Sequence, residues 1–131
     1  HYKLPVINEN LKFLLNNDFK CFKNSSALFA MTGHILIKAL DKDNCITFSK
    51  RGLAYLRKKL KFKGLIISDD ISMKALSGNY LTNSQKALAA GCNLSLYCAG
   101  KTKESENLLK MTPYIDSFTI KKTKQFYNFL R

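Results

Sequence analysis

The chain has 131 residues, of which 46% are apolar, and this length and composition suit a single domain with a sizeable core. No run of 18 or more apolar residues is present, so no membrane-spanning helix is expected. The formal net charge is +13, from 22 lysines and arginines against nine acids, which favours an anionic partner over a cationic one. Because the chain begins with His1 rather than Met, we expect a fragment or a processed product.

The distribution of the positive charge weakens the case for a nucleic-acid-binding module. Most of the cations are lysines spread along the whole chain, and the densest group runs from Arg57 to Lys63. This group lies in a helical pattern and its exit, where a solvated helix face is favoured over a phosphate-binding patch. Aromatic residues interleaved with arginine on one face are missing from the pattern. We therefore expect neither nucleic acid nor a membrane as a partner.

The four cysteines, Cys21, Cys45, Cys92 and Cys98, do not form a Cys-x-x-Cys pair. The two histidines lie far from any zinc-type ligand pattern, so no metal and no cofactor is expected. We interpret the cysteines as reduced, partly buried thiols of a cytoplasmic protein.

Apolar periodicity predicts that helices and strands alternate along the chain. Helices are predicted over residues 8–22, 50–60, 82–90 and 103–111, with weaker signals at 71–76 and 115–131, and strands over 27–31, 65–67 and 93–98. Residues 1–5 are predicted as a loop, and residues 35–43 as a loop or a short helix. Such alternation indicates parallel strands joined by right-handed crossovers. Three units are too few to close an eight-stranded barrel, so a small open sheet and part of a larger barrel both stay open.

Polar residues follow two of the predicted strands. Strand 65–67 is followed by Ser68, Asp69 and Asp70. These residues are interpreted either as a helix N-cap or as an active site at the carboxyl end of a parallel sheet. Strand 27–31 ends in the same way, with a short polar segment that leads to His34. This histidine is interpreted either as a substrate contact or as a residue that bonds within its own loop.

Residues 63–73, Lys-Gly-Leu-Ile-Ile-Ser-Asp-Asp-Ile-Ser-Met, resemble the nucleophile motif of family 3 glycoside hydrolases. The similarity is to the bacterial β-N-acetylglucosaminidase branch that acts in peptidoglycan recycling. Residues 30–35 resemble the preceding strand end of that branch, where alanine is usual in place of Gly33, and residues 89–93 resemble its Ala-Gly-Cys-Asp turn, with Asn93 in place of the acid. Residues 1–5 are similar to the segment after the mobile catalytic loop. The resemblance covers about residues 1–100.

The resemblance implies an α/β fold, namely the C-terminal portion of a (β/α)₈ barrel of which this chain holds about the last three β/α units. Residues 1–131 would form a single partial domain, with the barrel part at 1–100 and a terminal helical segment at 101–131. By position, Asp69 matches the nucleophile and His1 the general acid/base. The candidate substrate-binding residues are His34, Asp70 and Met73.

The activity implied is that of a retaining exo-glycosidase that removes terminal β-linked N-acetylglucosamine from muropeptides. A carboxylate such as Asp69 attacks the anomeric carbon, and an imidazole such as that of His1 exchanges protons near neutral pH. One alternative is an inactive truncated or split-gene fragment of such an enzyme, and another is a small basic binding module. The expected partners are a carbohydrate substrate and the missing N-terminal part of the barrel as a separate chain.

Overall fold

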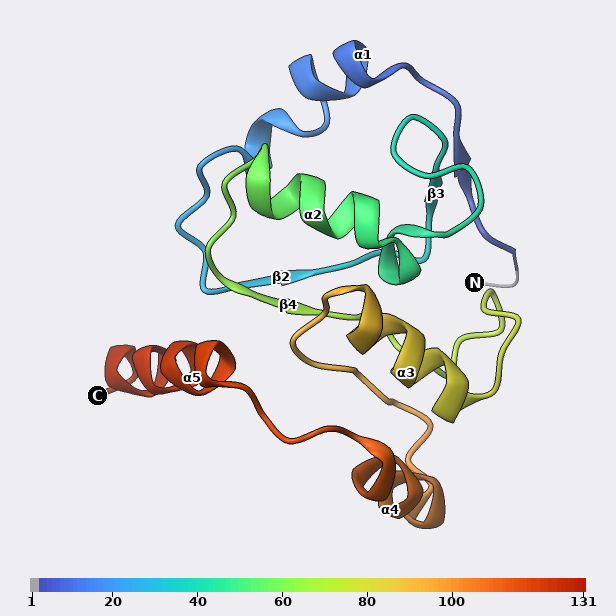
Figure 1. Cartoon of the computed structure of the whole chain (residues 1–131), viewed down its shortest axis with the longest axis vertical. Helices are drawn as coiled ribbons and strands as arrows, with labels where there is room; N and C mark the ends of the chain where they lie inside the picture. Colours follow the sequence, from blue (N-terminus) through green and yellow to red (C-terminus); the bar gives the residue numbers. More distant parts are fainter. Residues whose placement is uncertain (1–2) are drawn as a thin grey trace.

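The computed structural model describes residues 3–131 and shows an α/β chain with two short parallel strand pairs and five helices among these residues (Figure 1). The elements in chain order are β1 (Val6–Ile7), α1 (Leu11–Asn16), β2 (Phe29–Met31), β3 (Leu36–Ile37), α2 (Lys50–Lys58), β4 (Leu65–Ile67), α3 (Tyr80–Ala90), α4 (Thr102–Met111) and α5 (Ser117–Phe129), with 3-10 turns at Lys20–Phe22 and Ile46–Phe48.

The central unit is the parallel pair of β2 and β4, which the alternation of elements predicts. Phe29 lies opposite Leu65, and Met31 lies opposite Ile67. Residue Leu94 continues this sheet on the other side of β4 through a parallel bridge to Ile67. The smaller pair of β1 and β3, also parallel, falls where only loops or a short helix were expected.

The core lies on the side of the β2–β4 pair that α2 and α3 cover (Figure 1). Ile66 of β4 is fully buried against Leu53 of α2 and Ala87 of α3. Because side chains alternate across a strand, the neighbours of Ile66 point to the other side. There Met31 is 60% exposed and Leu94 37% exposed. The sheet therefore has one face packed by helices and one apolar face that is partly open.

The helix ends follow local signals with one exception. The Ser49 hydroxyl accepts the N–H of Gly52 and caps α2, as expected. Helix α3 ends at Gly91, whose φ of 120° suits glycine. The predicted start of α3 at Thr82 is wrong, because the side chain of Asn79 accepts the Thr82 N–H and starts the helix at Tyr80.

Three predicted elements are shorter than expected or absent. The helix predicted over 8–22 is limited to α1 and a 3-10 turn, because the Asn17 side chain bonds back to the Phe13 carbonyl and ends the first helix. Residues 71–76 form turns instead of a helix. The strand predicted over 93–98 is reduced to the Leu94 bridge, since the Leu96 N–H donates to the Ser68 hydroxyl and not to a backbone carbonyl.

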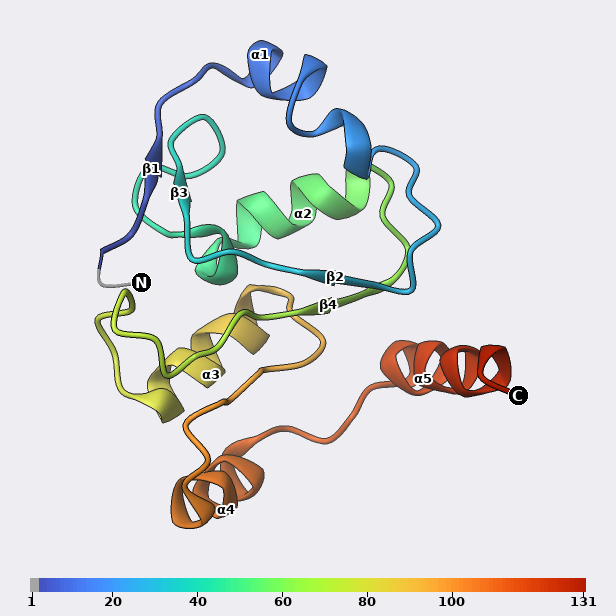
Figure 2. The ribbon, with the colours of Figure 1, turned by 180° about the vertical axis from the view of Figure 1, so that it is seen from behind.

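Of the two C-terminal helices, α4 packs against α3, and α5 lies on the side where β2 begins (Figures 1 and 2). The ring of Phe126 in α5 meets that of Phe29 edge to face, with 5.0 Å between centroids. Within residues 3–131, none of the helices is both long and apolar enough to cross a membrane.

Candidate functional site

The polar strand ends singled out from the sequence meet at the carboxyl edge of the β2–β4 pair. The N–H of Thr32 donates to the Ile67 carbonyl at 2.9 Å, which extends the pairing beyond both strands. On the other side of β4, the Ser68 N–H donates to the Leu94 carbonyl at 3.0 Å. Ser68 and the acids after it do not cap a helix, because the next helix begins at Tyr80. The N-cap interpretation is therefore wrong, whereas an active site at this strand end stays a prediction.

A buried series of hydrogen bonds connects the ends of β2 and β4 through Thr47, which belongs to neither strand. His34, which is 5% exposed, has Nδ1 2.8 Å from the Thr47 hydroxyl and Nε2 2.9 Å from the backbone carbonyl of Asp70. A carbonyl only accepts, so Nε2 carries the proton that is donated to Asp70. In the neutral imidazole, Nδ1 then accepts the proton of the Thr47 hydroxyl.

The same series of hydrogen bonds continues from Thr47 to Thr32 and to the backbone of Asp69. The Thr32 hydroxyl lies 2.9 Å from that of Thr47 and can donate to it, while the Asp69 N–H points to the Thr32 hydroxyl at 3.4 Å. The donors then all run in one direction, from the Asp69 N–H through Thr32 and Thr47 to His34 and the Asp70 carbonyl. The chain holds the backbone of both acids.

The interpretation that His34 bonds within its own loop is wrong, because its two partners, Thr47 and the Asp70 carbonyl, lie 13 and 36 residues away. Both ring nitrogens bond within the protein, so the ring supports the backbone of the two acids. Its predicted contact with a substrate stays a prediction. Thr47 was missed by the sequence reasoning, since it follows no strand and belongs to no recognised motif, and only the fold brings it 2.8 Å from His34.

The carboxylate of Asp70 is bound on several sides. It accepts the N–H of Ser72 at 3.0 Å, the Ser72 hydroxyl at 2.8 Å and the N–H of Cys98 at 3.1 Å. Partial burial acts to raise the pKa of Asp70, but these hydrogen bonds outweigh it and hold the pKa below its usual value. Asp70 therefore links the end of β4 to the segment around Cys98.

The carboxylate of Asp69 is less occupied. Among the described residues it accepts one hydrogen bond, from the N–H of Asp70 at 2.8 Å, and the residue is half-buried. Met73 is also half-buried, and its N–H donates to the Asp70 carbonyl at 3.1 Å. His1 lies outside the described residues. The structure thus brings Asp69, Asp70, Met73 and His34 together and distinguishes the two acids by their surroundings.

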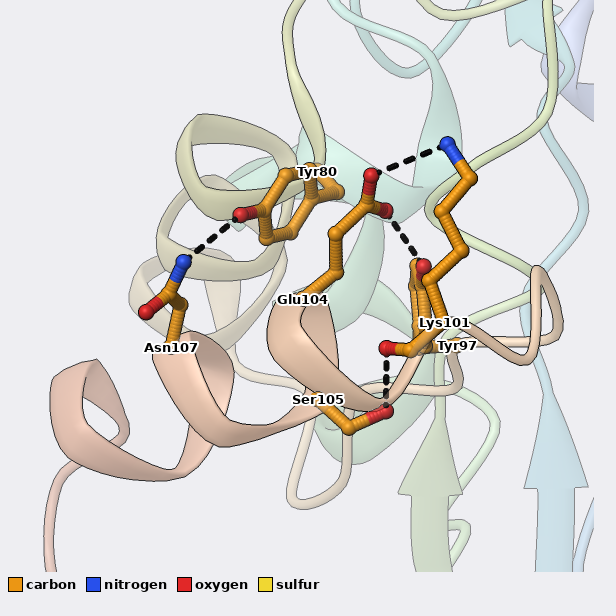
Figure 3. Close-up of polar contacts among 6 residues, drawn as sticks. All are labelled: Tyr80, Tyr97, Lys101, Glu104, Ser105 and Asn107. Atoms are coloured by element: carbon orange, nitrogen blue, oxygen red, sulfur yellow. Dashed lines mark hydrogen bonds and ion pairs between the residues drawn. The ribbon is translucent and has the colours of Figure 1, made fainter.

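A polar cluster at the start of α4 holds the segment that carries Cys98 (Figure 3). The Tyr97 hydroxyl donates to Glu104, whose other carboxylate oxygen pairs with the Lys101 ammonium at 3.0 Å. Tyr80 of α3 packs against the Tyr97 ring and accepts a hydrogen bond from Asn107. Desolvation and the hydrogen bond to Glu104 raise the pKa of Tyr97 to about 12, so it stays a neutral donor.

The four cysteines divide into a buried pair and an exposed pair. Cys45 and Cys92 are buried free thiols, whereas Cys21 and Cys98 are exposed, so the expectation of partial burial is wrong for the latter two. Burial raises the pKa of the Cys92 thiol to about 12. Within residues 3–131 no cluster of three His, Cys, Asp or Glu side chains is placed to hold a metal ion.

The basic segment from Arg57 to Lys63 is not a uniform solvated helix face. Arg57 turns inward and donates to the carbonyls of Phe62 and Gly64, and to the Asn93 side chain at 2.7 Å. Lys58, by contrast, is exposed.

Comparison with known proteins gives consistent results. The family model for the glycosyl hydrolase family 3 N terminal domain matches residues 1–124. A beta-hexosaminidase of Psychromonas ingrahamii is 33% identical over 134 residues, which covers 97% of this chain and 37% of that protein. A beta-hexosaminidase of Glaesserella parasuis is 36% identical over 104 residues, which covers 75% of this chain and 31% of that protein. The chain spans about a third of the length of these relatives.

Solved structures show the same fold. CbsA from Thermotoga neapolitana aligns with a TM-score of 0.78 at 29% identity, over 100% of this chain and 34% of that chain. Native NagZ from Neisseria gonorrhoeae aligns with a TM-score of 0.78 at 24% identity, over 93% of this chain and 36% of that chain. The second likeness is one of fold alone.

Proposed function

From the premise that this chain belongs to glycosyl hydrolase family 3, we propose that it carries the nucleophile of a retaining β-N-acetylglucosaminidase. The observation that carries the proposal is the difference between the two adjacent acids. Asp70 is held by Ser72 and by Cys98, whereas the Asp69 carboxylate accepts one hydrogen bond among the described residues. A nucleophile needs an ionised carboxylate with an oxygen left free to form a bond.

The proposed reaction has two steps. An Asp69 oxygen bonds to the anomeric carbon while the glycosidic C–O bond breaks and the leaving oxygen takes a proton from the His1 imidazolium. The imidazole of His1 then takes a proton from water, whose oxygen displaces Asp69 and regenerates the carboxylate. The sugar class follows from the beta-hexosaminidase relatives, and a muropeptide source and a cytoplasmic location remain part of the proposal.

The backbone of Asp69 and Asp70 has a supporting role in this proposal. A misplacement of the attacking oxygen by about 1 Å can cost a large factor in rate, so a carboxylate on a loop needs a fixed backbone. The hydrogen-bond chain through Thr32, Thr47 and His34 supplies that support. We assign His34 as a positioning residue in the reaction.

We also propose that the three strand segments around β2, β4 and Leu94 are the last three strands of a (β/α)₈ barrel. The open apolar face at Met31 and Leu94 supports this, because strands of a barrel point one set of side chains inward against each other. On this view the chain by itself lacks most of the sugar pocket. We expect it to bind and hydrolyse substrate only together with the rest of the barrel, in the same chain or as a separate one.

The test uses the full open reading frame that contains these residues and a chromogenic β-N-acetylglucosaminide. We expect Asp69→Asn to lower kcat by roughly 10³-fold or more, because the amide cannot form the glycosyl-enzyme. Asp18→Asn is the matched control, since it makes the same change at an exposed acid outside the site and should leave kcat unchanged. Near-normal activity of Asp69→Asn would remove Asp69 from the nucleophile role.

The acid role of His1 has its own test. His1→Ala should slow substrates with leaving groups of high pKa more than activated aryl glycosides, since only the former need protonation. Equal losses on both substrates would argue against proton donation by His1.

The alternative of an inactive fragment agrees with the proposal on the 131-residue chain alone and differs on the full open reading frame, where it expects no turnover. Because the Met31 and Leu94 face is open, this alternative expects no turnover of the chromogenic substrate by the chain. Turnover by the chain that Asp69→Asn abolishes would contradict it.

A further inference from the structure

A hollow of about 340 Å³ lies at the opposite edge of the sheet from the two acids, where β2 and β4 begin. Two loops and one helix build it: the loop before β2, the loop before β4, and α5. Its polar lining includes Asn24, Ser25, Ser26, Lys61, Lys63 and Lys122. None of the residues that line it is acidic.

The two loops are fixed to each other. The Asn24 N–H donates to the Leu60 carbonyl at 2.8 Å, and the Leu65 N–H donates to the Leu28 carbonyl at the same distance. Gly64 permits this approach, because a Cβ there would lie 2.5 Å from the Ala27 carbonyl oxygen. The walls of the hollow therefore have a defined backbone before any ligand arrives.

Helix α5 closes the hollow from the third side. The edge-to-face contact of Phe126 with Phe29 fixes α5 against the start of β2. Lys122 lies one turn earlier on α5 and donates to the Gln125 side chain at 3.2 Å. The three lysines around the hollow thus come from elements that hold one another in place.

The backbone of this region is strained at one residue. Within residues 3–131, Asn24 and Lys61 are the only non-glycine residues with positive φ, at 55° and 58°. Asparagine adopts this conformation readily, whereas lysine does so at an energetic cost. Strain of this kind persists where the surrounding structure imposes it, and it is found at ligand sites more often than elsewhere. It directs Lys61 to the rim of the hollow.

The lysine charges at the hollow are not neutralised by an acid among residues 3–131. The ammonium groups of Lys61 and Lys63 have no hydrogen-bond or ion-pair partner among the described residues. The hydroxyls of Ser25 and Ser26 supply further donors, although Ser25 already accepts the N–H of Ala27. The ammonium groups and hydroxyls of residues that line the hollow are donors suited to the oxygens of a phosphate.

We propose that this hollow binds a small phosphate-bearing anion through Lys61, Lys63 and Lys122. All of its walls belong to the described residues, so the site does not need the remainder of a barrel. It is also independent of the glycosidase proposal, since it shares no residue with the carboxyl edge where Asp69 lies.

Titration calorimetry of the full open reading frame with inorganic pyrophosphate tests the site. We expect saturable binding that Lys61→Gln with Lys63→Gln weakens at least roughly tenfold, as expected for the loss of two charge-assisted contacts. The matched control is Lys58→Gln with Lys59→Gln, which removes the same charge from exposed lysines that do not line the hollow. The control should bind pyrophosphate as the parent does.

A single variant separates the role of the ammonium from that of the backbone. Lys61→Gly relieves the positive φ, so it should raise the Tm while it weakens pyrophosphate binding. Absence of saturable binding would overturn the proposal, and so would equal weakening by the two double variants. Association with vesicles of 20% anionic lipid that pyrophosphate does not compete would also overturn it, in favour of a membrane surface.

Discussion

The two edges of the β2–β4 pair differ in how their charged side chains are hydrogen-bonded. At the carboxyl edge, the backbone and the hydroxyls of the protein itself bind Asp70 and hold the peptide of Asp69. At the amino edge, the ammonium groups of Lys61 and Lys63 border a hollow without partners among the described residues, whereas Arg57 and Lys122 each donate to a neighbouring side chain. The comparison shows two acids whose backbone or carboxylate is held by hydrogen bonds, and two lysines whose ammonium groups have no partner among the described residues.

The largest effect on folding is expected at the amino edge. Gly64→Ala places a Cβ 2.5 Å from one backbone carbonyl oxygen and 2.6 Å from a second, and neither can move without separating the strands. We expect a loss of about 3 kcal/mol in the free energy of unfolding, measured by urea denaturation. Gly33→Ala is the control at the carboxyl edge, since its Cβ would meet only Ile35 at 3.6 Å. Equal stability of the two variants would show that the amino edge is not closely packed.

The next effect is expected at the carboxyl edge. Thr47→Val removes the hydroxyl that joins His34 to Thr32 and leaves both buried groups without that partner. The free energy of unfolding should fall by about 2 kcal/mol. In the full open reading frame, kcat should also fall while KM changes little, because the position of Asp69 is altered. Thr47→Ser keeps the hydroxyl and should restore most of both quantities; a failure of this rescue would argue against the hydrogen-bond chain.

The pH dependence of stability sharpens the comparison further. The pKa of Asp70 is lowered in the folded chain, so its stabilising effect is present above the unfolded pKa of about 3.9 and is lost as the pH falls through the folded pKa. Asp70→Asn should therefore lower the Tm at pH 7 and reduce the further loss below about pH 4. Tm measured from pH 7 to pH 3 tests this, and parallel curves for the parent and the variant would contradict it.

The smallest effect is expected at Arg57, which donates to the carbonyls of Phe62 and Gly64 at the amino edge. Its guanidinium bonds to the amide oxygen of Asn93, where the family motif carries an acid. Burial lowers the pKa of Arg57, and a carboxylate would offset that cost. Asn93→Asp should stabilise the chain by about 1 kcal/mol in urea denaturation. In an Arg57→Gln background the gain should disappear, and persistence of the gain would show that the ion pair is not its source.

Several elements could be predicted because their signals are local. The Ser49 cap and the spacing of Leu53, Leu56 and Leu60 specify α2 within about two residues of its observed end. The apolar run of β4 is short and bounded by glycine and acids. The absence of a helix at 71–76 could not be predicted from local signals. Two tertiary hydrogen bonds take up the Ile71 peptide groups instead, one from the Ile71 N–H to the Leu96 carbonyl and one from the Asn83 amide to the Ile71 carbonyl. Both bonds join segments that lie far apart in sequence.

The sequence predicted that Asp69 and Asp70 follow a strand, but not that their carboxylates differ in their hydrogen bonds. The sequence by itself determined the parallel strands β2 and β4, the helices α2 and α3, and the position of Asp69 and Asp70 after a strand, since apolar periodicity and strand-end polarity can be identified from neighbouring residues. Only the tertiary structure decided which acid is bound, that His34 supports the backbone of both acids, and that three lysines meet at one hollow. Those outcomes depend on hydrogen bonds and packing between residues 13 to 97 positions apart, for which no local pattern exists.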